Sequence, residues 1–223
     1  YLNKHMWKES ADAAQQIIAA NTYHLFGDIS RLFAVENESN PEYIYVFPCI
    51  NQTNYGNIVM AHTFPPAYPI QTNWIIFGAQ FKLYTKFVDS FEPADKRLNM
   101  ILTNYTDTKG VYHEMSKDAG GNALNNARSF KFVPDPAGLS ADMGNDIPVI
   151  RYADILLSRA EALNELNGPQ DASVSLINEV RARAGASEIK LAGYPSKEKL
   201  RDFILAERGR EFFGEGKRRE DLI

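Results

Sequence analysis

Residues 150–167 read IRYADILLSRAEALNELN, and their spacing decides how the last third of the chain folds. Apolar side chains recur every three or four positions, which places them on one face of an α-helix. Gly168 and Pro169 follow directly, and this pair is a typical helix stop. The sequence therefore predicts an amphipathic helix here. Its apolar face consists of Ile150, Ala153, Leu156, Leu157, Ala160 and Leu163.

Two more helices are expected after this stretch. One runs from Ala172 to Ala184 before Gly185, and the other begins after Ser196. Ser196 is expected to be a plain N-cap, because Lys199 stands where a capping box would have Glu or Gln. Short-linked antiparallel helix pairs of about 34 residues are typical of tetratricopeptide-like repeats. The apolar faces of the two helices consist of Ala172, Leu176, Ile177, Val180 and Ala184, and of Leu200, Phe203, Ile204 and Phe212.

The first 146 residues have a weaker pattern. An Ala-rich helix is expected over residues 8–26, and a buried strand over Tyr43–Phe47, between Pro41 and Pro48. Residues 51–73 have no clear period and are expected to form a long irregular loop, because their prolines prevent a long helix. Three further elements are expected: a helix over residues 81–91 that ends near Pro93, and short strands over residues 98–102 and 130–133.

The fold class that follows is mainly α, with tetratricopeptide-like helix pairs packed against an irregular lobe that has a few short strands. We expect one domain over residues 1–223, with a helix and an aromatic-rich lobe in 1–146 and a charged helical part in 147–223. Of the 26 aromatic residues, 14 lie between Tyr43 and Tyr112. Residues 147–223 carry 13 basic and 13 acidic residues, so the net charge of −4 arises in 1–146. The chain starts at Tyr1 without a leader and ends in a charged stretch, so we expect a piece of a longer protein.

Composition excludes several classes of function. The acidic balance is unlike the basic surface of a nucleic-acid-binding protein, so no nucleic-acid partner is expected. A single cysteine, Cys49, excludes an intrachain disulfide and a CxxC site. It ends a strand-like apolar run, so we expect a buried, inert thiol rather than a nucleophile. No apolar run approaches the roughly 18 residues of a membrane span.

Motifs for catalysis and cofactor binding are missing from the sequence. HExxH, GxxxxGK[ST], GxGxxG and GxSxG do not occur, and the four histidines have no i,i+4 pairing, so we expect neither a metal nor a cofactor. Paired carboxylates are the signature of glycosidases, and Asp89, Glu92 and Asp95 are one candidate set. A second set lies among many arginines and is expected to form a structural ion-pair network. It consists of Glu207, Glu211 and Glu215.

Amide side chains gather in the middle of the chain beside aromatic ones. Sugars pack their C–H faces on aromatic rings, and amides can both donate to and accept from hydroxyl groups. A loop with both residue types is therefore a candidate carbohydrate platform, although the same aromatics would also serve to fill the core of an irregular lobe. The candidate glycan-binding residues are Asn51, Gln52, Asn54, Tyr55, Tyr68 and Trp74.

The C-terminal third also resembles a known family. The matching residues are RYADILL at 151–157, AEALNE at 160–165 and INEVRARAG at 177–185, followed by Leu200, Ile204, Glu207-Arg208, Glu211-Phe212, Glu215-Gly216, Arg218 and Asp221-Leu222. This run resembles the SusD/RagB family of outer-membrane nutrient-binding lipoproteins. Upstream features agree with it, among them Tyr23-His24-Leu25 and Phe87-Val88-Asp89-Ser90-Phe91.

The resemblance implies a cell-surface protein of Bacteroidota that captures glycans, or in some cases peptides, for import through a TonB-dependent outer-membrane transporter. It also implies an N-terminal lipid anchor, for which the internal Cys49 is not suited. We expect a binding protein rather than an enzyme. The alternatives are a helical-repeat scaffold that binds only protein, and a carbohydrate-active enzyme that uses Asp89, Glu92 or Asp95.

Overall fold

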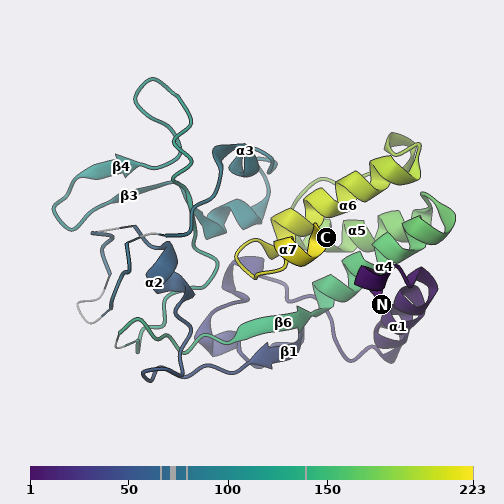
Figure 1. The fold of residues 1–223 in the computed structure, drawn as a ribbon, viewed down its shortest axis with the longest axis horizontal. Coiled ribbons are helices and arrows are strands. Elements are labelled where there is room, and N and C mark those ends of the chain that lie inside the picture. The colour runs from purple at the N-terminus through teal and green to yellow at the C-terminus, as the bar shows by residue number, and fades with distance from the viewer. Residues whose placement is uncertain (66, 71–73, 79, 139, 223) are drawn as a thin grey trace. The chain divides into compact units, whose positions relative to one another are not determined.

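The computed structural model describes residues 1–65, 67–70, 74–78, 80–138 and 140–222 (Figure 1). The chain forms two compact units. The helical unit comprises residues 1–29, 39–46 and 148–223, and the irregular unit comprises residues 30–38 and 47–147. The predicted fold class is confirmed, because helices dominate and the few strands are short. That the chain is one domain stays a prediction.

The helical unit is built around α4 (Tyr152–Asn167), which contacts α1 (Trp7–Ala20), α5 (Asp171–Ala184) and α6 (Lys197–Phe212). A short helix, α7 (Arg218–Asp221), packs on α6. The predicted apolar faces of the last three long helices meet in one core, in which Leu156, Ile177 and Leu200 are fully buried. Because α1 contacts α4, the first α-helix of the chain packs with the charged C-terminal helices, although a long stretch of sequence separates them.

Helix ends follow the local sequence signals. The Ser196 hydroxyl accepts a hydrogen bond from the Lys199 backbone N–H at 3.3 Å, which confirms the N-cap of α6. Gly185 ends α5 in the left-handed region, with φ of 72°. The α1 helix is shorter than the predicted range 8–26, because Asn21 adopts a left-handed conformation with φ of 51° and stops it.

Strand β1 (Tyr43–Phe47) lies where the sequence predicts a strand, and it pairs with β6 (Ile147–Arg151). The expectation that β1 is buried is wrong, because Tyr45 is 56% and Phe47 59% exposed. The described part of the chain also has five short 3-10 segments. They are η1 (Leu2–Lys4), η2 (Ile29–Arg31), η3 (Val35–Asn37), η4 (Lys96–Met100) and η5 (Leu191–Gly193).

The irregular unit has two short helices, α2 (Val59–Thr63) and α3 (Thr85–Val88), and two small antiparallel pairs. Strand β2 (Ile101–Leu102) pairs with β5 (Arg128–Ser129), and β3 (Asn104–Thr106) pairs with β4 (Tyr112–Glu114). Its core holds Leu32, Phe33, Phe64, Met100 and Phe132. The predicted loop over residues 51–73 is largely irregular apart from α2; Pro66 and residues 71–73 lie outside the described part of the chain.

Three predictions for this unit are wrong in whole or in part. The helix expected over residues 81–91 is reduced to α3, because Leu83 pairs with Ala127 in an antiparallel bridge that fixes the preceding residues in an extended form. The strand expected over residues 98–102 is only β2, because the Asp95 carboxylate caps η4 by accepting from the Arg97 N–H at 3.0 Å. The second predicted strand, at 130–133, lies instead at Arg128–Ser129.

No helix among the described residues is both long and apolar enough to cross a membrane.

Candidate functional site

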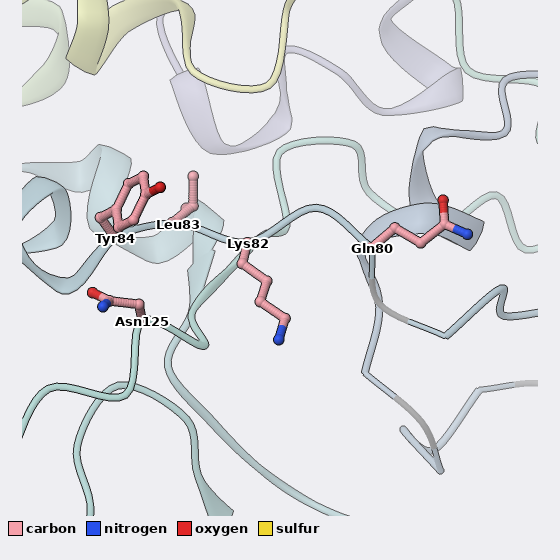
Figure 2. Close-up of a pocket in the computed structure, with 5 residues that line it drawn as sticks. All are labelled: Gln80, Lys82, Leu83, Tyr84 and Asn125. Atoms are coloured by element: carbon pink, nitrogen blue, oxygen red, sulfur yellow. The ribbon is translucent and has the colours of Figure 1, made fainter.

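A pocket of about 380 Å³ opens on the irregular unit, next to α3. Figure 2 shows Gln80 on one side, Tyr84 and Asn125 on the other, and Lys82 between them. Leu83 completes the described lining. The pocket thus combines an aromatic ring, two amides and an amine, and no carboxylate belongs to the part of its lining that the structure describes.

Backbone pairing holds one wall of the pocket. The Leu83 N–H donates to the Ala127 carbonyl at 2.8 Å, which ties residues 82–84 to residues 125–127. Asn125 lies in the left-handed region with φ of 51°, and its side-chain oxygen accepts from the Thr85 N–H at 2.8 Å. Since that oxygen is engaged, the NH₂ group of Asn125 is the part that remains to meet a ligand.

His62 of α2 fixes the opposite wall. Its Nδ1 lies 2.9 Å from the Gln80 side-chain oxygen, and its ring packs against Phe77 and Phe81 at centroid distances of 4.9 and 5.4 Å. The Phe81 N–H donates to the His62 carbonyl at 3.1 Å. These contacts hold Gln80 in place while Phe81 stays 58% and Tyr84 72% exposed. Exposed rings beside fixed amides are the combination that sugar binding uses.

The amide-rich loop predicted from sequence is folded around one carboxylate. Asp142 Oδ1 accepts from the backbone N–H groups of Asn54 at 3.0 Å and Gly56 at 3.2 Å. This turn leaves Tyr55 64% exposed and Gln52 exposed as well. Three of the six candidates, Gln52, Asn54 and Tyr55, are therefore accessible side chains on one tight loop.

Two other candidates, Asn51 and Trp74, both hydrogen-bond to the backbone of residues 137–138. Asn51 Nδ2 donates to the Ala137 carbonyl at 2.6 Å, and Trp74 Nε1 donates to the Gly138 carbonyl at 2.9 Å. Both side chains therefore hold residues 137–138 against the loop. Asn51 Oδ1 is buried and has no partner among the described atoms.

Tyr68, the sixth candidate, belongs to a different cluster. Its ring lies 5.1 Å from that of Phe64, 5.7 Å from Tyr105 and 5.8 Å from Phe130. Burial in this cluster raises the pKa of the Tyr68 phenol. The structure thus groups five of the six candidates around residues 51–55 and 137–138 and sets Tyr68 apart; as glycan contacts all six stay predictions.

The carboxylates and the thiol considered for catalysis have other surroundings. Asp95 is buried and paired with Arg97, whose Nη2 lies 2.7 Å from Asp95 Oδ2. In the described part of the chain no group of three or more His, Cys, Asp or Glu side chains is arranged to hold a metal ion. Cys49 is half-buried rather than fully buried, and desolvation raises its pKa, which disfavours the reactive thiolate.

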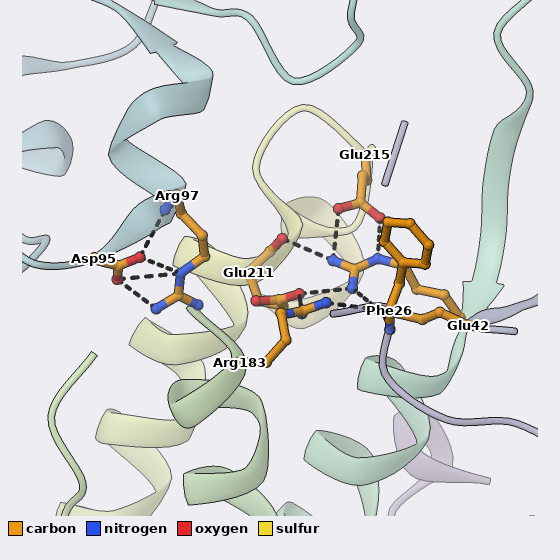
Figure 3. A network of polar contacts seen from close by, with 8 residues as sticks. Phe26, Glu42, Asp95, Arg97, Arg183, Glu211 and Glu215 are labelled. Atoms are coloured by element: carbon orange, nitrogen blue, oxygen red, sulfur yellow. Dashed lines mark hydrogen bonds and ion pairs between the residues drawn. The ribbon is translucent and has the colours of Figure 1, made fainter. Parts of the chain in front are cut away.

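Glu207 and Glu211 of α6, with Glu215 just after it, belong to a buried ion-pair network as the sequence predicts, but their main partners are arginines of other elements. Arg151 Nη1 lies 2.7 Å from Glu211 Oε1, and its Nε lies 2.8 Å from Glu215 Oε2 (Figure 3). Arg181 Nη1 pairs with Glu207 Oε2 at 2.7 Å. All five side chains are at least 95% buried, so these residues stabilise the helical unit.

The sequence does not reveal the pocket lining, because its spacing predicts a helix over residues 81–91. The run Gln80-Phe81-Lys82-Leu83-Tyr84 alternates polar or amphipathic residues with apolar ones, and this period of two is typical of an extended segment. That signal was available, but the three- and four-residue spacing of Phe81, Tyr84, Phe87 and Phe91 concealed it. No pattern in the sequence indicates that Asn125, which lies far along the chain from residues 80–84, would line the same pocket.

Comparison with known proteins gives one consistent result. The sequence profile described as "SusD family" matches residues 36–223. SusD-like protein P38 of Formosa agariphila is 39% identical over 84 residues, which are 35% of this chain and 16% of that protein. SusD-like protein P25 of the same organism is 47% identical over 77 residues, 34% of this chain and 14% of that protein.

Solved structures agree with the profile. A SusD superfamily protein from Parabacteroides distasonis has a TM-score of 0.73 and 25% identity, covering 97% of this chain and 46% of the other. Surface glycan-binding protein A from Bacteroides thetaiotaomicron, solved in complex with laminarihexaose, has a TM-score of 0.71 and 21% identity, covering 99% of this chain and 51% of the other. The chain thus spans about half the length of these two proteins.

Proposed function

The chain belongs to the SusD family, and from this premise we propose that it is a non-enzymatic surface protein that binds oligosaccharides. It would deliver them to a TonB-dependent transporter and be held at the outer membrane by a lipid anchor, as the family resemblance implies. The observation that carries the proposal is the exposed ring of Tyr84 in a pocket lined by the amides of Gln80 and Asn125.

The chemistry of this pocket suits capture without bond cleavage. An aromatic ring supplies affinity by packing on the C–H face of a sugar, on the scale of the roughly 0.5–1.5 kcal/mol that a well-placed pair of aromatic rings gains. The amide NH₂ groups of Gln80 and Asn125 would orient the hydroxyl groups. No carboxylate lines the described pocket to serve as general acid or nucleophile, which favours binding over hydrolysis.

The amide loop is a second surface for the same ligand class. Gln52, Asn54 and Tyr55 are exposed on a loop whose backbone Asp142 fixes, so the backbone would need little further ordering on binding. Asn51 and Trp74 would support this loop as well as contact sugar, and Tyr68 would offer an aromatic face in its own separate cluster. A scaffold that binds only protein has no comparable observation in its favour.

The proposal is tested by calorimetric titration of the full chain with a panel of soluble oligosaccharides, with the reducing ends assayed after each titration. We expect saturable binding of at least one oligosaccharide and no new reducing ends. Release of shorter oligosaccharides would show that the protein is an enzyme and would refute the proposal of a non-enzymatic binding protein. Absence of binding across neutral, uronate and sulfated oligosaccharides would refute a glycan-binding function.

A further inference from the structure

We infer that the pocket beside α3 selects acidic sugars, which carry a carboxylate or a sulfate group, over neutral ones. This inference rests on the proposed glycan-binding function and assigns the ligand class of the same pocket. It is carried by Lys82, which lines the pocket, and by Arg128, which is not among the described lining residues but lies opposite Lys82 in the register of the pairing. Neither side chain has an acidic partner in the described part of the chain.

Arg128 is a buried cation that has no acidic partner among the described residues. The residue is only 5% exposed, and its guanidinium donates through Nη1 to the Asn126 and Ala127 carbonyls. Its Nε has no partner among the described atoms. A guanidinium stays charged when buried, and an ion removed from water without a counter-ion is costly. Backbone carbonyls supply only part of that compensation.

Lys82 adds a second cation at a neighbouring position. The antiparallel bridge joins Leu83 to Ala127, so the register sets Lys82, one residue before Leu83, opposite Arg128, one residue after Ala127. Like charges directly opposite each other on paired segments are destabilising. Lys82 is exposed and lines the pocket, and no ion pair involves it in the residues that the structure describes.

The remaining polar groups of the pocket point to the same ligand class. The Asn125 oxygen accepts from the Thr85 N–H, and the Gln80 oxygen accepts from His62 Nδ1 in the tautomer that carries the proton there, which leaves both NH₂ groups as donors. With the Lys82 amine, the pocket offers a set of N–H donors and no carboxylate that would repel an anion. A uronate or a sulfate ester has oxygens that accept from all three and neutralises the local positive charge.

The test compares three probes of similar length in calorimetric titration of the full chain: laminarihexaose, which is neutral, a hexamer of galacturonate and a sulfated carrageenan hexamer. The variant is Lys82→Gln, and Lys86→Gln on the exposed side of α3 is the control. Removing one exposed charge contact is expected to weaken binding of an acidic probe about fivefold and to leave laminarihexaose unaffected. The Lys86→Gln protein should match the wild type.

The outcomes separate this inference from the proposed function. Tighter binding of the galacturonate or the sulfated hexamer, weakened by Lys82→Gln and by added salt, supports the inference, and the preferred probe identifies carboxylate or sulfate. Binding of laminarihexaose alone, or acidic binding that Lys82→Gln leaves unchanged, overturns the inference and leaves glycan binding intact. Binding of none of the three refutes the proposed function and the inference with it.

Discussion

Arg151 and Glu42 lie 109 positions apart in the sequence, yet Arg151 Nη1 donates to Glu42 Oε1 at 2.6 Å in the fully buried centre of the helical unit. The other oxygen of Glu42 accepts from Arg183 Nη1 and from the Phe26 N–H, each at 2.8 Å (Figure 3). One carboxylate therefore connects the segment before β1 to α5, to the end of β6 just before α4, and to the segment that follows α1.

Glu42→Gln is predicted to destabilise the protein strongly, because it leaves two buried arginines short of an acceptor. Breaking a buried ion pair from one side costs about 3 kcal/mol or more of unfolding free energy. For a chain of this size that corresponds to a fall of about 6–12 °C in Tm. Urea unfolding followed by circular dichroism measures the change.

The control for this variant is Asp12→Asn, which removes the exposed pair between Lys8 and Asp12 on α1. Both of its side chains are more than half exposed, so no measurable change in stability is expected. Equal stability of Glu42→Gln and Asp12→Asn would show that the network around Arg151 does not stabilise the helical unit.

Gly56→Ala is predicted to disrupt the amide loop. A Cβ on Gly56 would lie 2.4 Å from Asp142 Cβ and 2.6 Å from its Cα, so the backbone must move. Overpacking of this kind costs about 1–3 kcal/mol. Gly27→Ala is the control, because a Cβ there meets nothing within 4 Å. Thermal unfolding of both variants should show a lower Tm for Gly56→Ala only, and equal Tm values would contradict the close approach of Asp142.

Asp107 is predicted to titrate at an unusually low pH. Its carboxylate accepts from His113 Nε2 at 2.9 Å and from the backbone N–H groups of Val111 and Lys109, and these bonds, the one from His113 foremost, lower its pKa from 3.8 to about 2. The resulting stabilisation is present above pH 3.8 and is lost as the pH falls through about 2.

His113→Ala should raise the pKa of Asp107 while leaving it below its ordinary value, since the two backbone donors remain. A titration of the Asp107 carboxyl by nuclear magnetic resonance, in wild type and variant, measures both values. An unchanged pKa in the variant would mean that the hydrogen bond to His113 does not stabilise the carboxylate in solution.

Local signals were enough to predict much of the helical unit. The spacing of Leu156, Ile177 and Leu200 gave the core faces, Ser196 gave a helix start, and the interleaved arginines around Glu211 indicated an ion-pair network. The helix faces and the cap depend on residues within a few turns of one another. The partners of Glu211 in the network, Arg151 and Arg183, lie 60 and 28 residues away and were not indicated by the spacing. Spacing could not reveal the role of Glu42, because its partners Arg151 and Arg183 lie 109 and 141 residues away.

The irregular unit was predicted less well for the same physical reason. The pocket depends on the pairing of Leu83 with Ala127 and of Thr85 with Asn125, the latter 40 residues apart. Such pairings override the helical spacing of residues 81–91. Amides and aromatics in residues 51–74 were a useful compositional signal, but it did not indicate that Trp74 would donate to the Gly138 carbonyl or that Tyr84 would be the most exposed ring near a pocket.

The most direct test of glycan binding at the Tyr84 pocket is the affinity of Tyr84→Ala for the oligosaccharide that the wild type binds best. Tyr112→Ala is the matched control, since Tyr112 is 60% exposed in the same unit and does not line the pocket. Loss of the ring's packing is expected to weaken binding about tenfold in Tyr84→Ala and to leave Tyr112→Ala at wild-type affinity. Wild-type affinity in Tyr84→Ala would contradict the assignment of the pocket as the glycan site.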